Sequence, residues 1–144
     1  MKCAILIVEN DELHQELLGE TLDNVWPQIA RYLITGRNSL TNFIAGQDKD
    51  TVYITILDHH ISGDITGQAV AIELINNGFQ CLFIGNSDKP ENQPYLINKE
   101  AHLHSKSNPT ELVNKLQILI PLIESLESLN LEEQITEGSD LNLR

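Results

Sequence analysis

Basic side chains are scarce in this chain of 144 residues. Nine lysines and arginines stand against 21 aspartates and glutamates, which gives a formal net charge of -12 at neutral pH. Proteins that bind nucleic acid neutralise phosphates with a basic face, so no nucleic-acid partner is expected. The same negative charge argues against docking on an anionic membrane surface.

Cysteines and long apolar runs are also rare. Cys3 and Cys81 each begin an apolar run, and two isolated cysteines make neither a disulfide framework nor a zinc-binding spacing. No run approaches the roughly 18 apolar residues of a membrane span. The short run at the N-terminus meets acidic residues too soon for a signal peptide. These absences favour a cytoplasmic globular protein.

What is present is an alternation of strand and helix patterns. Apolar, β-branched runs predict strands over 4–8, 32–35, 51–57, 81–84 and 101–104. Helical spacing of apolar residues predicts helices over 12–24 and 39–46, then one that ends at Gly78, a weaker one over 91–98 and a last one that opens at 108–111. Five strands that alternate with five helices indicate a doubly wound α/β domain with a mostly parallel sheet.

Polar residues follow three of the predicted strands. Glu9 comes after the first strand, Asp58 after the third, and Lys106 after the fifth. Ligands of doubly wound sheets bind beyond the carboxyl ends of the strands. Two carboxylates brought together there repel each other unless a cation neutralises them, and Mg²⁺ accepts one or two carboxylates and keeps several waters. A carboxylate beside Mg²⁺ and a lysine can attack phosphorus as a nucleophile.

At these positions the chain resembles the receiver domains (CheY-like) of response regulators in two-component and phosphorelay signalling. Residues 8–12 (VENDE) resemble the acidic doublet that follows the first strand of that family. Residues 56–67 (ILDHHISGDITG) resemble the segment around its phospho-accepting aspartate, and residues 105–112 (SKSNPTEL) resemble its lysine and last helix. The resemblance implies a flavodoxin-like (βα)5 fold with a five-stranded parallel sheet in the order 2-1-3-4-5, here over residues 1–122.

The resemblance also implies roles for individual residues. Asp58 would accept a phosphoryl group from a sensor histidine kinase or a histidine phosphotransfer protein. Lys106 and Ser87 would contact the phosphoryl oxygens. The candidate Mg²⁺ ligands are Asp58 with Glu9, Asn10, Asp11 and His60. No enzyme activity is implied beyond self-catalysed phosphoryl transfer to Asp58 and hydrolysis from it, and output would pass to a downstream protein target.

Several departures from the family pattern favour an alternative, a pseudo-receiver that works as an interaction or dimerisation module without phosphorylation. Asn10 stands where the family has its second acid, Gly85 stands where it has a hydroxyl residue, and the loop after Asp58 is one residue longer. Two further alternatives stay open. One is a flavodoxin-like binding protein, although no glycine-rich phosphate loop follows the first strand. The other is a transition-metal site built from His59, His60, His102 and His104.

The C-terminal part has an apolar pattern of its own. Leu112, Leu116, Leu119, Ile123 and Leu126 recur at the 4-3-4-3 spacing of a coiled-coil seam. This spacing predicts that the last helix extends beyond residue 122 towards residue 130 and forms a homodimer or binds a partner helix. The alternative is that the early positions of the seam pack on the sheet. The polar residues 132–144 are expected to form a disordered tail.

Overall fold

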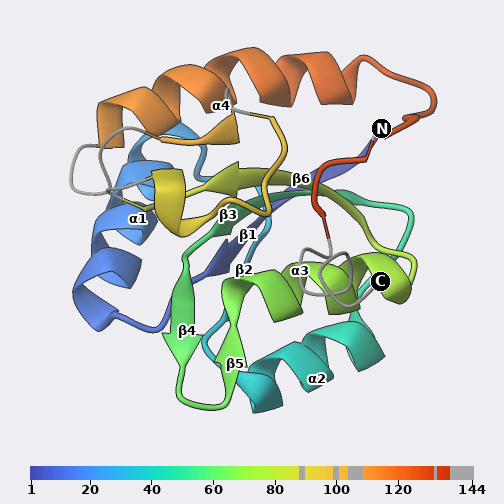
Figure 1. The fold of residues 1–144 in the computed structure, drawn as a ribbon. Helices are drawn as coiled ribbons and strands as arrows, with labels where there is room; N and C mark the ends of the chain where they lie inside the picture. The colour runs from blue at the N-terminus through green and yellow to red at the C-terminus, as the bar shows by residue number, and fades with distance from the viewer. Residues whose placement is uncertain (88–89, 99–100, 104–108, 132, 137–144) are drawn as a thin grey trace.

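The computed structural model describes residues 1–87, 90–98, 101–103, 109–131 and 133–136. The described part is an α/β structure in which four helices cover the two faces of a four-stranded parallel sheet (Figure 1). No described helix is both long and apolar enough to cross a membrane.

The parallel sheet has the order β2-β1-β3-β6. Its strands are β1 (Cys3–Val8), β2 (Arg31–Ile34), β3 (Val52–Leu57) and β6 (Gln80–Gly85). All six residues of β3 are buried, as expected for a central parallel strand covered on both faces. At the open edge of β6, its last residue Gly85 forms an isolated parallel bridge with His102. The fifth strand predicted over 101–104 is therefore reduced to one bridge among the described residues.

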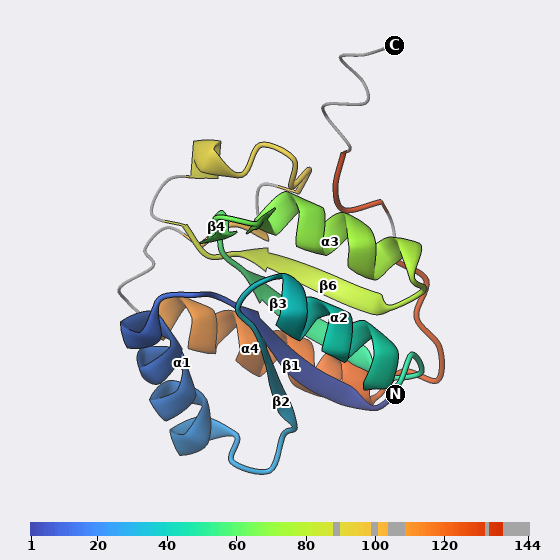
Figure 2. The ribbon, with the colours of Figure 1, turned by 90° about the horizontal axis from the view of Figure 1, so that it is seen from below.

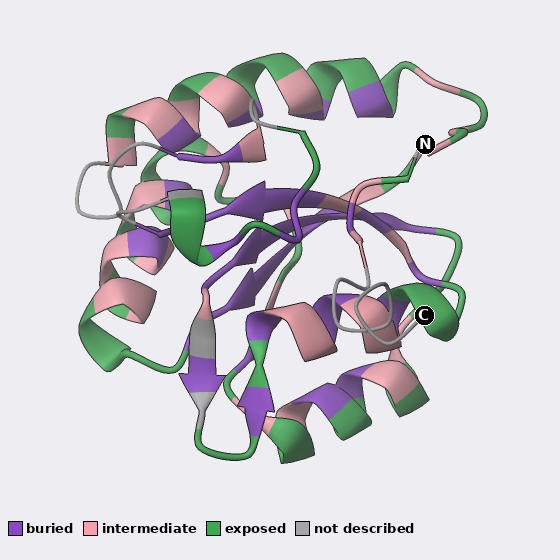
Figure 3. Cartoon of the chain, viewed as in Figure 1, coloured by how far each residue is buried: buried purple, intermediate pink, exposed green. Residues whose placement is uncertain are grey.

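Each face of the sheet carries two helices. α1 (Glu12–Val25) and α4 (Pro109–Glu124) pack on one face, and α2 (Arg37–Gly46) and α3 (Gly67–Asn76) pack on the other (Figure 2). Successive side chains of a strand point to opposite faces, so Leu6 belongs to the α2–α3 core and Ile5 to the α1–α4 core. The buried residues follow this layer of strands through the centre of the molecule (Figure 3).

The boundaries of α1, α2 and α3 agree closely with the sequence pattern. α1 begins after Asp11, whose carboxylate accepts hydrogen bonds from the backbone N–H groups of Leu13 (2.9 Å) and His14 (3.4 Å). An aspartate in this position satisfies backbone donors that have no partner within the helix. The chain leaves α3 through Gly78, whose φ of 83° lies in the left-handed region that glycine adopts without strain.

A β-hairpin occupies the segment predicted to be a loop after Asp58. β4 (His60–Ser62) pairs antiparallel with β5 (Ile65–Thr66), and Gly63 and Asp64 form the turn between them. Ile61 and Ile65 are buried in the core that faces α2 and α3. The loop prediction was wrong because these two isolated apolar residues are too few to give a strand pattern in the sequence.

The helix predicted over 91–98 is also wrong. Only a short 3-10 turn, η1 (Pro90–Asn92), forms, and Leu96 instead makes an antiparallel bridge with Ile135. Pro94 lacks the N–H that a helix would require, and Tyr95 and Leu96 are buried in the α2–α3 core. Tertiary packing therefore decides the conformation of this segment.

The C-terminal helix is shorter than predicted. α4 ends at Glu124 rather than near residue 130, and Leu112, Leu116 and Ile123 of the seam are buried against the sheet, in agreement with the alternative that the early seam positions pack there. The terminal ammonium of Met1 donates to the backbone carbonyls of Leu126 (2.5 Å) and Glu124 (3.2 Å), close to the end of the helix.

Beyond α4, residues 133–136 are not a disordered tail. They run past β6, with Ile135 buried in the core, and they are called the C-terminal strap below. Residues 137–144 and 132 of the predicted tail lie outside the described residues. The seam's role in a dimer stays a prediction.

Candidate functional site

Glu9 and Asp58 lie next to each other at the carboxyl edge of the sheet. Val8 and Leu57, the last residues of β1 and β3, are paired in register, and the backbone N–H of Asp58 donates to the Val8 carbonyl over 3.0 Å. Glu9 directly follows β1, and Asp58 directly follows β3. Both are buried, with relative exposures of 1% for Glu9 and 8% for Asp58. The two residues therefore stand at one edge of the sheet, while the roles predicted for their carboxylates stay predictions.

Short-range hydrogen bonds fix the position of each acid. Glu9 Oε2 accepts from the backbone N–H of Asp11 (3.2 Å), and the Glu9 carbonyl accepts from the Gln15 side chain (2.9 Å). Asp58 Oδ1 accepts from the backbone N–H of His59 (2.8 Å). The start of α1 therefore holds Glu9, while the first residue after Asp58 holds the second carboxylate.

The end of β6 brings two further polar residues to the same edge. The backbone N–H of Asn86 donates to the Leu57 carbonyl over 2.9 Å, so Asn86 lies beside the end of β3, one residue before Asp58. Ser87 follows and is buried, and its Oγ accepts from Asn92 Nδ2 at 3.4 Å. Gly85, in the slot where the resemblance implies a hydroxyl, is the last residue of β6.

Other predicted site residues have different positions. The Asp11 side chain caps α1, and its hydrogen bond from the Leu13 N–H lowers the pKa of this exposed carboxyl. Asn10 is exposed. The backbone of His60 belongs to β4, while its side chain lies outside the described part of the structure. Lys106 also lies outside the described residues, so its predicted contact with phosphoryl oxygens stays a prediction.

The donor chemistry at the edge suits a hard divalent cation. Two carboxylates from Glu9 and Asp58 are the number that Mg²⁺ usually takes from a protein, because it keeps several waters. Within the described residues no group of three or more His, Cys, Asp or Glu side chains could hold a metal ion. Asp11 is engaged as a helix cap, so a Mg²⁺ site here would rest on the two buried acids and water.

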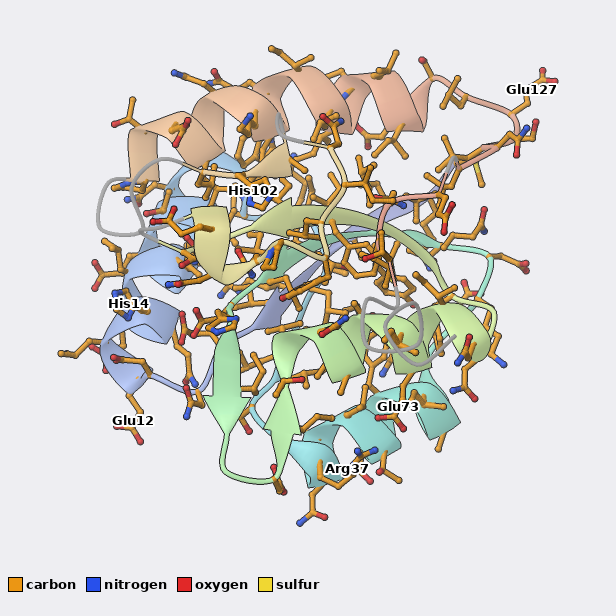
Figure 4. All side chains as sticks on the ribbon, viewed as in Figure 1. Glu12, His14, Arg37, Glu73, His102 and Glu127 are labelled. Carbon is orange, nitrogen blue, oxygen red and sulfur yellow. The ribbon has the colours of Figure 1, made fainter. Side chains whose placement is uncertain are left out.

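The proposed histidine cluster receives no support from the described residues. His102 lies at the outer side of β6, where its Nε2 is 3.3 Å from the Leu96 carbonyl (Figure 4). His14, which the figure also labels, is on α1 and pairs with Asp11 at 3.3 Å. His104 lies outside the described residues.

Sequence analysis missed three residues that support the site. Gln93, with no exposed surface, donates from Nε2 to the Leu57 carbonyl (2.7 Å) and to the Tyr95 hydroxyl (3.3 Å). Gly67 passes so close to Asp58 that a Cβ on it would collide with the Asp58 carbonyl and lie 3.1 Å from the Tyr95 hydroxyl. Gln93 and Tyr95 belong to the segment predicted to be a weak helix, and only the interruption at Pro94 marked it as unusual.

Comparisons of this chain with protein-family models, with curated proteins and with solved structures gave no match. The family resemblance therefore rests on the three short sequence segments quoted above. The geometry that supports it is the pair of buried carboxylates at the ends of β1 and β3.

Proposed function

We propose that this chain is a receiver-type signalling module that accepts a phosphoryl group on Asp58 from a phosphohistidine of a kinase or phosphotransfer protein. One observation carries the proposal. Glu9 and Asp58 are buried side by side, each directly after one of two strand residues paired in register. Burial disfavours a charged carboxylate, so two adjacent acids in such a place are more consistent with a site for a cation and a phosphoryl group than with a structural role.

The proposed reaction is a simple displacement at phosphorus. An Asp58 carboxylate oxygen forms a P–O bond as the P–N bond of the phosphohistidine breaks, and the leaving imidazole nitrogen keeps the electron pair and takes a proton. Hydrolysis of the acyl phosphate later returns the carboxylate and releases inorganic phosphate. The fixed position of Asp58, bonded through its N–H to Val8 and through Oδ1 to the His59 N–H, keeps the nucleophile oriented.

Glu9 and Asp58 are the residues that would hold Mg²⁺. The ion would supply positive charge next to the oxygens of the phosphoryl group. Ser87, buried at the end of β6, and Lys106 are the proposed partners of these oxygens. Ser87 Oγ accepts a hydrogen bond from Asn92 Nδ2, and a serine hydroxyl can accept and donate at the same time.

The test is binding of beryllofluoride, a phosphoryl mimic, measured by calorimetry with and without Mg²⁺. The wild-type chain should bind it only with Mg²⁺, and Asp58→Asn should lose binding because the mimic requires the carboxylate. Asp50→Asn, which alters an exposed acid just before β3, is the matched control and should bind like wild type. Equal binding by wild type and Asp58→Asn, or none by wild type, would exclude Asp58 as the acceptor.

A second function has one observation in its favour. Asp11 is engaged as the cap of α1 and Asn10 is exposed, so the described edge offers two acids rather than three. This arrangement suits a pseudo-receiver that binds partners without phosphorylation. The absence of Mg²⁺-dependent beryllofluoride binding in the same calorimetry experiment would favour this function.

A further inference from the structure

The outer edge of β6 pairs with the Gln134 side chain of the C-terminal strap instead of with another strand. Gln134 Oε1 accepts from the Phe83 N–H at 2.9 Å, and Gln134 Nε2 donates to the Cys81 carbonyl at 2.7 Å. These two bonds satisfy backbone groups that an edge strand would otherwise expose. Next to Gln134, Ile135 is 6% exposed and packs in the α2–α3 core.

The strap is also paired with the segment that follows η1. The Ile97 N–H donates to the Gln134 carbonyl and the Thr136 N–H donates to the Tyr95 carbonyl, each over 2.9 Å, on either side of the Leu96–Ile135 bridge. On the other side, Gln68 Nε2 donates to the Thr136 carbonyl over 3.3 Å. A short antiparallel ladder therefore fastens the strap to residues 95–97.

This same segment reaches the candidate phosphorylation site. Gln93 is bonded to the Leu57 carbonyl, one residue before Asp58, and to the Tyr95 hydroxyl. The Tyr95 hydroxyl and the Asp58 carbonyl border the same side of Gly67. Burial raises the pKa of Tyr95 to about 12, and the charge of Asp58 acts in the same direction. Leu57, Gln93, Tyr95 and the strap thus form one continuous series of hydrogen bonds that begins one residue before Asp58.

We propose that the C-terminal strap is the element that reports phosphorylation of Asp58: the phosphoryl group draws residues 92–95 towards itself and the strap leaves the edge of β6. This inference rests on the proposed function. A phosphoryl group adds negative charge and three acceptor oxygens. Donors of the segment that runs from η1 into the strap-paired residues 95–97 include the Asn92 and Gln93 amides and the Tyr95 hydroxyl.

The strap is suited to release because, within the described residues, few contacts hold it. One buried apolar side chain, Ile135, and the hydrogen bonds of Gln134 and Thr136 fasten the strap, whereas continuous strand pairing holds the β1–β3–β6 core, and segments with fewer buried contacts open at a lower free energy. Release would uncover Phe83 and Cys81 backbone groups on β6, and this exposed strand edge can pair with an extended segment of a partner.

Hydrogen exchange of the full chain tests the inference. Three N–H groups that bond the strap report its release: those of Phe83, Ile97 and Thr136. The control is the N–H of Ile5, which donates to the Ala30 carbonyl just before β2. Beryllofluoride with Mg²⁺ should speed exchange of the three reporters about tenfold, within the usual range of coupling between sites, and leave Ile5 unchanged. Unchanged or slower exchange at the reporters while the mimic is bound would overturn the inference and leave the proposed function intact.

Reciprocity provides a second measurement. A ligand that releases the strap must bind more tightly, by the same factor, to a chain whose strap is already loose. Gln134→Ala should therefore bind beryllofluoride about tenfold more tightly than wild type, and Glu133→Ala, which alters an exposed neighbour, should not. Equal affinity of the two variants overturns the coupling. No binding by wild type or either variant overturns both the inference and the proposed function.

Discussion

Acidic residues are exposed at one end of the parallel sheet and buried at the other. At the amino end, Asp48 stays exposed and is used locally: its carboxylate accepts from the Asp50 N–H (2.7 Å) and the Thr51 hydroxyl (3.1 Å), and its carbonyl accepts from the Tyr53 hydroxyl (2.6 Å). At the carboxyl end, Glu9 and Asp58 are buried next to each other.

This difference separates structural polar groups from candidate functional ones. An exposed carboxylate that caps a turn stabilises the chain and keeps its hydration. Two buried neighbouring carboxylates lose hydration and repel each other, so burial without a compensating cation or donor is unfavourable. The fold places this buried pair where doubly wound sheets bind ligands.

The largest expected difference between the ends concerns two glycines. Gly67→Ala should lower the free energy of unfolding by about 3 kcal/mol, because the added Cβ would collide with the Asp58 carbonyl and force the two backbone segments apart. Gly46→Ala, where no atom lies within 4 Å of the added Cβ, should change it by less than about 0.5 kcal/mol. Urea denaturation of both variants measures the contrast, and equal losses would refute it.

Two glutamines give the next contrast. Gln93→Ala should lose about 2 kcal/mol, because a fully buried side chain and its bonds to the Leu57 carbonyl and the Tyr95 hydroxyl are removed, although the Asn86 N–H still donates to that carbonyl. Gln80→Ala, at the amino end, removes a 3.0 Å bond to the Lys49 carbonyl in an exposed place and should lose less than about 0.5 kcal/mol. The same denaturation experiment measures both. A small loss in Gln93→Ala would show that the site does not depend on this residue.

The third contrast concerns Mg²⁺. At a free Mg²⁺ concentration ten times its dissociation constant, the ion should raise the free energy of unfolding of wild type by about 1.4 kcal/mol, because it binds the folded and not the unfolded chain. Glu9→Gln should lose most of this gain, and Asp48→Asn should keep it. Thermal unfolding with and without Mg²⁺ provides the measurement, with Ca²⁺-free buffers. A gain that persists in Glu9→Gln would place the ion elsewhere.

The smallest effect is the pH dependence of the amino end. The backbone hydrogen bond from Asp50, followed by the bond from Thr51, lowers the pKa of the Asp48 carboxyl from its ordinary value of 3.8. A lowered folded-state pKa contributes stability above 3.8, and this contribution is lost as the pH falls through the folded value. Wild type should therefore be slightly more stable than Asp48→Asn at neutral pH, and the difference should shrink in acid titrations. A difference that is the same at both pH values would contradict this assignment.

Much of the fold could be predicted because local patterns and packing agree. Val52–Leu57 is apolar or β-branched throughout and becomes the buried central strand, and Gly78 ends its helix as glycine usually does. The adjacency of Glu9 and Asp58 was predicted on the condition that the first and third strands are neighbours, an order that the family resemblance implied. The pairing of β1 with β3 meets that condition.

The rest could not be predicted because it depends on contacts between distant segments. The hairpin after Asp58 contains only two buried apolar residues, Ile61 and Ile65. The strap has one, Ile135, and its main tie to β6 is the Gln134 side chain, a polar residue that looks like any other in a hydrophilic stretch. The extended apolar seam at Leu126 gave a false signal because α4 ends at Glu124.

The most direct test of the account is phosphorylation itself. The full chain is incubated with acetyl phosphate, and its intact mass and peptide map are measured with and without Mg²⁺, for wild type and for Asp58→Asn. The account predicts that wild type gains one phosphoryl group, only with Mg²⁺, on the peptide that contains Asp58, and that Asp58→Asn gains none. A wild-type chain that remains unmodified, or a variant modified to the same extent, would contradict it.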